Sequence, residues 1–554
     1  MPTHEVTNQP PVLADYDVAQ DPALLAGLHA FGAGWAEPEL HEVGRLAGSA
    51  EVADMARVVN EYPPVLRTHD RFGHRIDEVE FHPHWHELMA LALSHGLHAA
   101  AWRTPQQGAH TARAAKFLVW GQTEAGHLCP VSMTYAVVPA LRQASALAQR
   151  FEPLLASFDY DFGLRDPETK RGLIAGMSMT EKQGGSDVRS NATTAAPAGD
   201  GSFRLVGHKW FTSAPMSDLF LVLAQAPGGL SCFFVPRVLP GGERNAIRLL
   251  RLKDKLGNRS NASAEVEYEG AVGWLVGEEG HGVRTIMEMV SATRLDATTG
   301  SAAGMRWGAV QAVHHARHRR AFGALLVDQP LMANVLADLV VESEAATLLS
   351  LRLAAATDRA AAGDEAEGLF RRLALPVGKY WICKRAPAHA AEALECLGGN
   401  GYVEESQMPR LYREAPLNSI WEGSGNVAAL DVLRAMLTRP LTVEAYLDEV
   451  ALGAGEDARL DEALEALRKE LVDPEDLQAR ARSVTERLAL VLQASLLVRH
   501  GAPDVADAFM SSRLAHGHSG AFGTLPPRAR LRALLERAAV EAGASSPPRG
   551  PAAA

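Results

Sequence analysis

The sequence predicts a mainly α-helical protein with a strand-rich central domain and a further helical region at its C-terminal end. Ala and Leu dominate the composition, and aromatic residues make up only 6% of the chain, which favours helices. The spacing of apolar residues changes from a helical to a strand-like period and back along the chain. At 554 residues, the chain is long enough for several domains.

The first region, residues 1–175, is expected to form a helical domain. After a proline-rich, polar start, apolar residues recur at intervals of three and four, as in HELMALALSHGLHAAAW (86–102). The second region, 176–280, contains short β-branched or aromatic segments such as LFLVLAQA (219–226), separated by turn residues. This pattern predicts a domain built from strands.

Helical spacing returns over 281–440, beginning with a long apolar-periodic segment over 282–320. Residues 441–545 predict a further helical domain with an uneven charge. The stretch 441–478 has twelve acidic and three basic residues, whereas 479–554 has ten arginines, no lysine and five acidic residues. The last residues, 546–554, are expected to be a disordered tail.

Bulk composition narrows the classes of function. The net charge of −12 gives no global field that would attract nucleic acid, although the arginine-rich end could do so locally. The four cysteines form no CxxC pair, which predicts reduced thiols in a cytoplasmic protein. The sequence shows neither an export signal nor 18 consecutive apolar residues, so we expect no membrane span. Alternating histidines at 82, 84 and 86 lack the partners of a zinc site, so we expect no metal.

A turn rich in small and hydroxylated residues, MTEKQGGSDVRSN (179–191), joins the first two regions. A pyrophosphate needs backbone N–H groups without a side chain in the way, which favours Gly185. The edge of a flavin ring needs hydroxyl and N–H partners, which Thr180 and Ser186 could supply. An ordinary tight turn has the same composition.

Two other motifs could face such a ring. In HKWFTSAP (208–215), Trp210 could cover one face while Thr212 and Ser213 touch the edge, although a tryptophan in the core of a sheet would look the same. In SIWEGSGN (419–426), Glu422 precedes a capping turn and a helix. A carboxylate there is a candidate base for removing a proton alpha to a carbonyl, or an exposed glutamate.

Two last motifs contain arginine and glycine. In HRRAFGALLVDQ (318–329), Arg320 could bind phosphate, or it could simply end a helix. In LECLGGNGY (394–402), a helix C-cap accounts for one glycine but not for all three.

Taken in this order, the five motifs resemble those of the acyl-CoA dehydrogenase superfamily, whose signature MTExxxGSD is similar to MTEKQGGSD (179–187). The resemblance implies an N-terminal helical domain, a middle β-barrel, a four-helix bundle and a bound FAD. By position, it implies that the flavin contacts are Met177, Met179, Thr180, Gly185, Ser186, Trp210, Phe211, Thr212, Ser213, Ile420, Trp421, Gly423, Ser424, Gly425 and Asn426.

The same resemblance implies that Arg320, Phe322, Gln329, Gly398 and Gly399 hold the ADP half of a neighbouring subunit's FAD, which makes an oligomer part of the site.

The resemblance also assigns the catalytic base. Glu422 occupies the usual position, and the alternative position used by isovaleryl-type members is Thr293, before Arg294, so only Glu422 remains. Arg434 follows Glu422 by twelve residues, and we consider that it pairs with Glu422 and weakens it as a base.

Within the superfamily, the long segments LKDKLGNRSNAS and NSIWEGSGN, with the C-terminal addition, resemble the bacterial flavoproteins of the alkylation response. This implies a homotetramer that binds double-stranded DNA through the C-terminal domain, protects it from alkylating agents and has weak acyl-CoA dehydrogenase activity at most. A phosphate-tracking face is then expected from Arg480, Arg482, Arg487, Arg499, Arg513, Arg528, Arg530, Arg532 and Arg537.

Alternatives remain at this point. These arginines could form an ordinary solvated face, and the chain could be a plain acyl-CoA dehydrogenase with a structural extension. It could also be a DNA-binding protein whose flavin is only structural. No base-reading motif is present, so any DNA binding should be mostly independent of sequence. The substrate, whether an acyl-CoA or a small alkylating agent, is left open.

Overall fold

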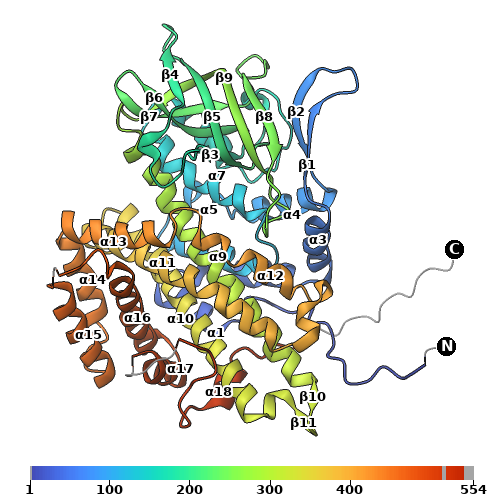
Figure 1. Cartoon of the computed structure of the whole chain (residues 1–554), viewed down its shortest axis with the longest axis vertical. Helices are drawn as coiled ribbons and strands as arrows, with labels where there is room; N and C mark the ends of the chain where they lie inside the picture. Colours follow the sequence, from blue (N-terminus) through green and yellow to red (C-terminus); the bar gives the residue numbers. More distant parts are fainter. Residues whose placement is uncertain (1–2, 474, 515–519, 542–554) are drawn as a thin grey trace.

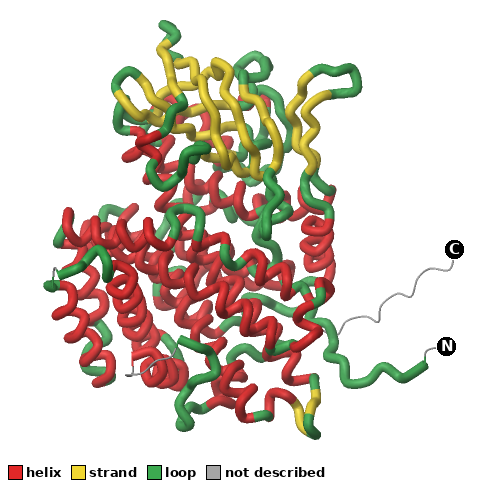
Figure 2. Tube along the Cα trace, viewed as in Figure 1, coloured by secondary structure: helices red, strands yellow, loops and turns green. Residues whose placement is uncertain are grey.

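Most strands gather at one end of the molecule, and helices make up the rest apart from a small hairpin at the opposite end (Figures 1 and 2). The computed structural model describes residues 3–473, 475–514 and 520–541. The tail predicted for 546–554 lies outside the described residues.

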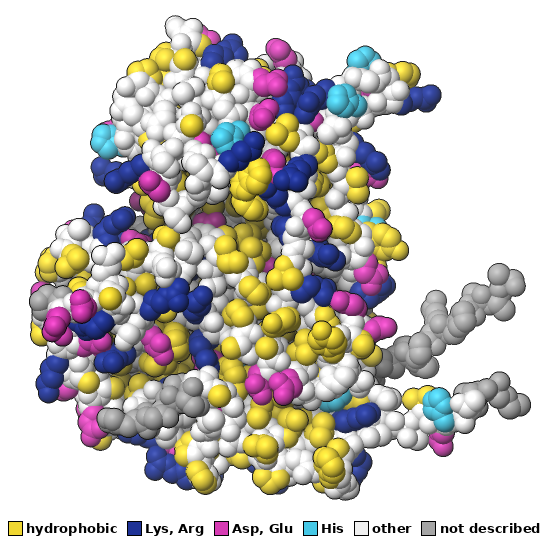
Figure 3. Space-filling model, in the orientation of Figure 1, with side chains coloured by type: hydrophobic (Ala, Val, Ile, Leu, Met, Phe, Trp, Pro, Cys, Tyr) yellow, Lys and Arg dark blue, Asp and Glu magenta, His cyan; other side chains and the backbone are white. Residues whose placement is uncertain are grey.

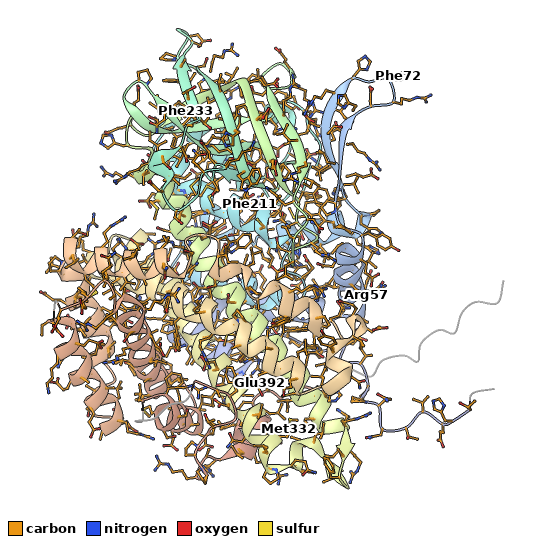
Figure 4. All side chains as sticks on the ribbon, in the orientation of Figure 1. Arg57, Phe72, Phe211, Phe233, Met332 and Glu392 are labelled. Atoms are coloured by element: carbon orange, nitrogen blue, oxygen red, sulfur yellow. The ribbon has the colours of Figure 1, made fainter. Side chains whose placement is uncertain are left out.

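The N-terminal region is helical, as expected, but it also contains a β-hairpin. Helix α1 begins at Pro22 because the Asp21 side chain accepts hydrogen bonds from the first free backbone N–H groups. The hairpin projects from the molecule, with Phe72 exposed at its tip (Figure 4). The elements are α1 (Pro22–Ala30), α2 (Glu37–Ala47), α3 (Ala50–Glu61), β1 (Val65–His69), β2 (Arg75–Glu80), α4 (Pro83–Ser94), α5 (Ala100–Arg103), α6 (Ala109–Gly121), α7 (Leu128–Leu141) and α8 (Ser145–Leu155).

The central domain is a sheet that closes on itself. Its order β3-β6-β4-β5-β9-β7 is completed by pairing of β7 with β6, and β8 adds to β9. The closed ring confirms the predicted β-barrel. The strands are β3 (Ala175–Ser178), β4 (Thr194–Pro197), β5 (Phe203–Ser213), β6 (Leu219–Ala226), β7 (Gly229–Pro236), β8 (Ile247–Leu252) and β9 (Ser263–Val276).

Three long helices form the centre of the bundle, and α9 packs against both of the others. Helix α9 starts beneath the barrel and runs to the small hairpin β10–β11 at the opposite end of the molecule (Figure 1). The elements are α9 (Gly282–His318), β10 (Arg320–Ala321), β11 (Ala324–Leu325), α10 (Pro330–Ala361), α11 (Glu365–Glu395), α12 (Met408–Glu414) and α13 (Gly425–Thr438).

The C-terminal helices lie along one side of the bundle and are joined to it by buried ion pairs. Arg513 pairs with Asp338 (2.5 Å) and Glu342 (2.9 Å) of α10, and all three side chains are nearly inaccessible. Arg352 of α10 likewise pairs with Glu449 of α14 at 2.7 Å. The helices are α14 (Leu441–Ala451), α15 (Ala458–Leu471), α16 (Ala481–His500), α17 (Pro503–Phe509) and α18 (Leu531–Glu536).

All four cysteines, Cys129, Cys232, Cys383 and Cys396, are buried free thiols. Burial raises the pKa of Cys129, Cys232 and Cys396 to about 12 in each case. Within the described part of the chain, no helix is long and apolar enough to cross a bilayer.

Candidate active site

A cavity of about 830 Å³ lies where the barrel, the N-terminal helices and the bundle meet. Phe211, at the end of β5, lines it between the strand and helical domains (Figure 4). The opposite wall is helix α9, from Val283 to Met305. Residues from the turn after β3 and from the loop before α13 complete the lining. The cavity therefore brings together three of the five sequence motifs.

Glu422 lies on the loop that leads into α13 and lines this cavity. Its backbone has a φ of +56°, and that of Gly423 is +102°. Thr293 Oγ1 donates a 2.6 Å hydrogen bond to the Glu422 carboxylate, and Arg294 Nε donates to the Glu422 carbonyl at 2.8 Å. Lys379 of α11 donates to the carbonyl of Gly423. Helices α9 and α11 therefore fix the loop from two sides.

Burial raises the pKa of the Glu422 carboxyl above its ordinary value. The hydrogen bond from Thr293 and the charges of Arg294 and Lys379 act in the opposite direction without cancelling the effect of burial. A partly buried carboxylate with a raised pKa binds a proton more strongly than a free one, which suits a base that removes a carbon-bound proton.

Arg434 lines the same cavity, but the interaction expected between it and Glu422 is not observed. The cations whose charges act on Glu422 are Arg294 and Lys379. Arg294 is itself balanced by Asp431, at 2.7 Å from Nη1. Arg434 lies on α13 beyond the loop, whereas Thr293 of α9 contacts the carboxylate and Lys379 of α11 binds the neighbouring carbonyl of Gly423.

Strand β3 presents Met177 to the cavity, and the turn after it presents Met179, Thr180, Gly185 and Ser186. A Cβ atom added at Gly185 would lie 2.5 Å from Thr180 Oγ1, so only glycine fits this cradle. These features fit a flat, polar-edged ring such as a flavin.

A buried ion pair braces this turn from behind. Lys209 Nζ lies 2.8 Å from Glu181 Oε1 and also donates to the carbonyl of Leu223 at 2.8 Å. The second oxygen of Glu181 accepts the backbone N–H of Ala192 at 2.7 Å. The pair therefore ties the turn to strands β5 and β6.

Strand β5 contributes to the cavity with alternate residues. Phe211 and Ser213 line it. Trp210 and Thr212 do not, because successive strand residues point to opposite faces. Thr212 hydrogen bonds to Ser178, and the backbone N–H of Trp210 donates to the carbonyl of Thr180 at 2.8 Å. These two residues therefore position the turn after β3 rather than line the cavity.

In the loop before α13, Ile420, Trp421, Gly423 and Ser424 also line the cavity. Trp421 Nε1 donates to Asn418 at 2.7 Å, which fixes the ring. The next two residues, Gly425 and Asn426, begin α13 outside the lining, and the Asn426 side chain accepts a 2.8 Å hydrogen bond from Arg482 of α16.

The residues expected to hold the ADP half of FAD lie elsewhere. Arg320 and Phe322 belong to the β10–β11 hairpin, about 40 Å along α9 from Thr293. Phe322 is 99% exposed. Gln329 caps the nearby start of α10, and Gly398 and Gly399 form an open 3₁₀ turn. None of these five lines the cavity of the same chain.

Three of the nine C-terminal arginines face inward, which corrects the expected nine-residue DNA face. Arg513 is buried against Asp338 and Glu342. Arg537 pairs with Glu344 at 2.6 Å. Arg499 pairs with Glu449 at 2.7 Å. Arg513 and Arg537 thus hold the C-terminal helices on α10, and Arg499 joins α16 to α14.

The other six arginines reach the surface to differing degrees. Arg480 and Arg487 both approach Glu470, at 3.6 and 2.9 Å. Arg530 pairs with Asp504 at 3.2 Å but remains 76% exposed. On the face shown in Figure 3, acidic and basic side chains alternate over the C-terminal helices. The exposed members of the predicted set are Arg482, Arg487, Arg528, Arg530 and Arg532.

Sequence reasoning missed several residues that shape this site. In the sequence, Thr293 marks only a position where the alternative base is absent, whereas in the structure its hydroxyl contacts Glu422. Lys379 carried no local signal, because its partner loop lies 44 residues away. The Glu181–Lys209 pair could have been suspected from a glutamate inside the MTE signature, because a buried carboxylate needs a cation.

Three family models match the chain in succession. They are the adaptive response protein AidB N-terminal domain over residues 8–162, the acyl-CoA dehydrogenase middle domain over 176–271 and the acyl-CoA dehydrogenase C-terminal domain over 280–437.

Full-length relatives agree with these matches. The chain is 48% identical to the putative acyl-CoA dehydrogenase AidB of Escherichia coli, over 92% of this chain and 94% of that protein. It is 29% identical to acyl-CoA dehydrogenase family member 11 of Caenorhabditis elegans, over 82% and 78% of the two chains. The crystal structure of C. elegans ACDH-11 in complex with C11-CoA superposes with a TM-score of 0.83 at 27% identity, covering 92% of each chain. The chain therefore belongs to the acyl-CoA dehydrogenase family, on its AidB-like branch, and is an FAD-dependent oxidoreductase that acts on CH–CH groups.

Proposed function

We propose that the protein dehydrogenates an acyl-CoA and that Glu422 removes the proton alpha to the thioester carbonyl. The observation that supports this assignment is the Glu422 carboxylate at the cavity wall, held by Thr293 and raised in pKa by burial. FAD, when bound, supplies the acceptor for the beta hydride. Met177, Met179, Thr180, Gly185, Ser186, Phe211 and Ser213 would hold its ring.

The test compares two partly buried glutamates that line the same cavity. Glu422→Gln keeps the shape of the side chain but cannot take a proton, so flavin bleaching by acyl-CoA under anaerobic conditions should slow at least about 100-fold. Glu414 also lines the cavity, but both of its oxygens accept hydrogen bonds from Asn258, at 2.6 and 2.8 Å. The rate of flavin bleaching in Glu414→Gln should therefore lie within a few-fold of the rate in the unmodified protein. Equal losses in both variants would remove Glu422 from the role of base.

A second function is proposed for the surface: binding of double-stranded DNA and its protection from alkylating agents. Its support is the likeness to AidB and the adaptive-response domain, together with the solvent-exposed arginines that precede and begin α18. Arg528 and Arg532 are both solvent-exposed, so their guanidinium groups are accessible to phosphates.

The DNA proposal is tested by the salt dependence of duplex binding. Arg528→Gln/Arg532→Gln should weaken binding of a random-sequence duplex and lower the slope of log K against log salt by about 2. A matched control is Arg71→Gln/Arg439→Gln, which removes the same charge from exposed positions elsewhere. A duplex affinity and a slope that are the same in both double variants would refute a phosphate-binding role for this surface.

A homotetramer is the proposed assembly. Its support is the separation, within one chain, between the cavity and the five residues expected to contact the ADP half of FAD. In an oligomer, the hairpin β10–β11 of one subunit could reach the cofactor of another. Analytical ultracentrifugation of the FAD-loaded protein checks the assembly state.

A further inference from the structure

The hairpin β10–β11 is too short to be stable by itself. Its strands, Arg320–Ala321 and Ala324–Leu325, have two residues each. Phe322 and Gly323 join them with φ values of +51° and +81°, and a type I′ turn requires a positive φ at both positions. A single two-stranded hairpin is marginal in water even when its strands are longer. The position of Phe322 at the tip therefore depends on support from the rest of the chain.

The N-terminal segment passes beside this hairpin (Figure 1), and the side chain of Asn8 binds it. Asn8 Oδ1 accepts the backbone N–H of Arg320 at 2.8 Å, and Asn8 Nδ2 donates to the carbonyl of Arg320 at 2.9 Å. A neighbouring β-strand would make the same pair of hydrogen bonds to Arg320. Arg319 Nη1 in turn donates to the Asn8 carbonyl at 2.6 Å. Asn8 therefore holds a hairpin that lies 312 residues further along the chain.

The local sequence fixes the conformation of this segment. Asn8 has a φ of +58°, which asparagine adopts more readily than most residues with a side chain. Pro10 and Pro11 have no backbone N–H and favour an extended backbone, so the segment joins neither a helix nor a sheet. The Pro11 carbonyl accepts a 2.9 Å hydrogen bond from His314 Nε2, near the end of α9. Residues 8–11 thus form an extended strap across the end of α9.

The strap also reaches the second segment of the expected ADP site. Asn400 Nδ2 lies 3.5 Å from Gln9 Oε1, at the outer limit of a hydrogen bond. Asn400 belongs to the 3₁₀ turn Gly398–Tyr402, where an added Cβ at Gly398 or Gly399 would meet no atom within 4 Å. The strap therefore contacts both the hairpin and the open glycine turn, which are distant in the sequence.

We propose that the strap is a positioning element of the surface that this chain offers to a neighbouring subunit's FAD, and that Asn8 is its main anchor. The inference rests on the proposed homotetramer, because the hairpin meets an FAD only in an assembly. Exposed apolar side chains flank the strap: Phe322 is 99% exposed, Tyr402 81% and Val12 87%. A second copy of the chain that covers them would exclude water from the hydrogen bonds of the strap and strengthen these bonds.

Glycine at position 8 isolates the contribution of the side chain. Asn8→Gly keeps the left-handed backbone, which glycine adopts freely, and removes both side-chain hydrogen bonds to Arg320. Asp15→Gly is the matched control, because Asp15 is also exposed and has a φ of +55°. Its side chain accepts the backbone N–H of Ala50 in α3 at 3.0 Å and makes no listed contact with the hairpin.

The experiment measures the release of FAD from the FAD-loaded protein as the rise in flavin fluorescence after dilution. All variants are compared at a concentration at which sedimentation gives the same assembly. Asn8→Gly should release FAD about five- to tenfold faster than the unmodified protein, as expected for the loss of two hydrogen bonds, and Asp15→Gly within about twofold. Equal release rates in the two variants would overturn the proposal.

A double variant separates this inference from the proposed assembly. If Asn8 acts through the hairpin, Asn8→Gly should change the release rate of Phe322→Ala by less than about twofold. The full five- to tenfold effect in that background would overturn the proposal, because Asn8 would then act elsewhere. Faster release from Phe322→Ala with an unchanged rate in Asn8→Gly would refute the strap and leave the partner-subunit site standing. Unchanged rates in both single variants would refute the strap and the partner-subunit site together.

Discussion

Glu422 occupies a left-handed backbone conformation, which costs a residue with a side chain about 1–2 kcal/mol. Three contacts from two helices offset this cost: the Thr293 hydroxyl, the Arg294 guanidinium and the Lys379 ammonium. The conformation keeps the carboxylate toward the cavity while α13 begins immediately afterwards. The strained backbone of Glu422 therefore serves to direct its carboxylate toward the cavity.

At Thr293, we predict that replacement by valine changes the pH dependence of flavin bleaching by acyl-CoA. The hydroxyl stabilises the ionised Glu422, so its loss should raise the pKa of Glu422 further. Only the ionised carboxylate accepts a proton, so the acid limb should move to higher pH. On the acid limb, at pH values well below the pKa of Glu422, the rate should fall about tenfold, consistent with a hydrogen bond to a charged group, whereas the rate on the high-pH plateau should change less than twofold. An acid limb that stays in place would contradict the role of Thr293.

Single residues also show what sequence can and cannot predict. Glu422, Gly185 and Ser424 were identifiable because their signals are local: a carboxylate beside a capping turn, and glycine where a Cβ would collide. Thr293 and Lys379 were not, because their partners lie 129 and 44 residues away and nothing near them in the sequence records the contact.

At the scale of elements, the order of helix, strand and helix follows from apolar spacing alone. The hairpin β1–β2 was missed because its strands have only five and six residues and lie between strongly periodic helices. The C-terminal arginines were predicted to form one surface because composition does not show which way each side chain points. Three of them point inward: two pair with acidic residues of α10, and the third pairs with Glu449 of α14.

Replacement of Arg513 by methionine should destabilise the docking of the C-terminal helices. The change leaves Asp338 and Glu342 buried without a full complement of cations, which costs about 3–5 kcal/mol. Arg530→Met removes an arginine that is 76% exposed and should change the free energy of unfolding by less than about 1 kcal/mol. Chemical denaturation of both variants checks this, and equal stabilities would contradict a buried ionic joint.

The same joint should be sensitive to acid. Burial alone would raise the pKa of Glu342, but the charges of Arg385 and Arg513 lower it to about 2. Arg352 and Arg499 likewise lower the pKa of Glu449 to about 2 against the effect of burial. Because both pKa values are lower in the folded than in the unfolded chain, the two ionised carboxylates stabilise the folded state fully above about pH 4.5. This stabilisation is lost as the pH falls toward 2. The protection factors of the amide protons in α16 and the melting temperature should therefore both fall between about pH 4.5 and pH 2. A melting temperature that is constant over this range would contradict the prediction.

For the whole molecule, the long helix α9 connects two surfaces that one chain cannot bring together: the cavity at one end and the hairpin β10–β11 at the other. Phe322 on that hairpin is 99% exposed and has a φ of +51°, which is unusual for a bulky residue. Both features suit a side chain that is covered only in an assembly.

Phe322→Ala should therefore leave the fold of each subunit intact but weaken FAD retention at least several-fold on gel filtration. A control is Phe72→Ala on the hairpin β1–β2, where the side chain is 74% exposed and has no expected cofactor contact. FAD retention that is unchanged in Phe322→Ala would remove this residue from the proposed partner-subunit site.

The burial of all four thiols determines how the protein reacts with electrophilic reagents. Thiolates, not thiols, react with alkylating reagents, and pKa values of about 12 leave almost no thiolate at neutral pH for Cys129, Cys232 and Cys396. Iodoacetamide should thus label no cysteine in the native protein and all four in urea, as mass spectrometry can verify. Labelling of the native protein would contradict this inertness. A chain built in this way could keep working in the presence of reagents that inactivate proteins with accessible cysteines.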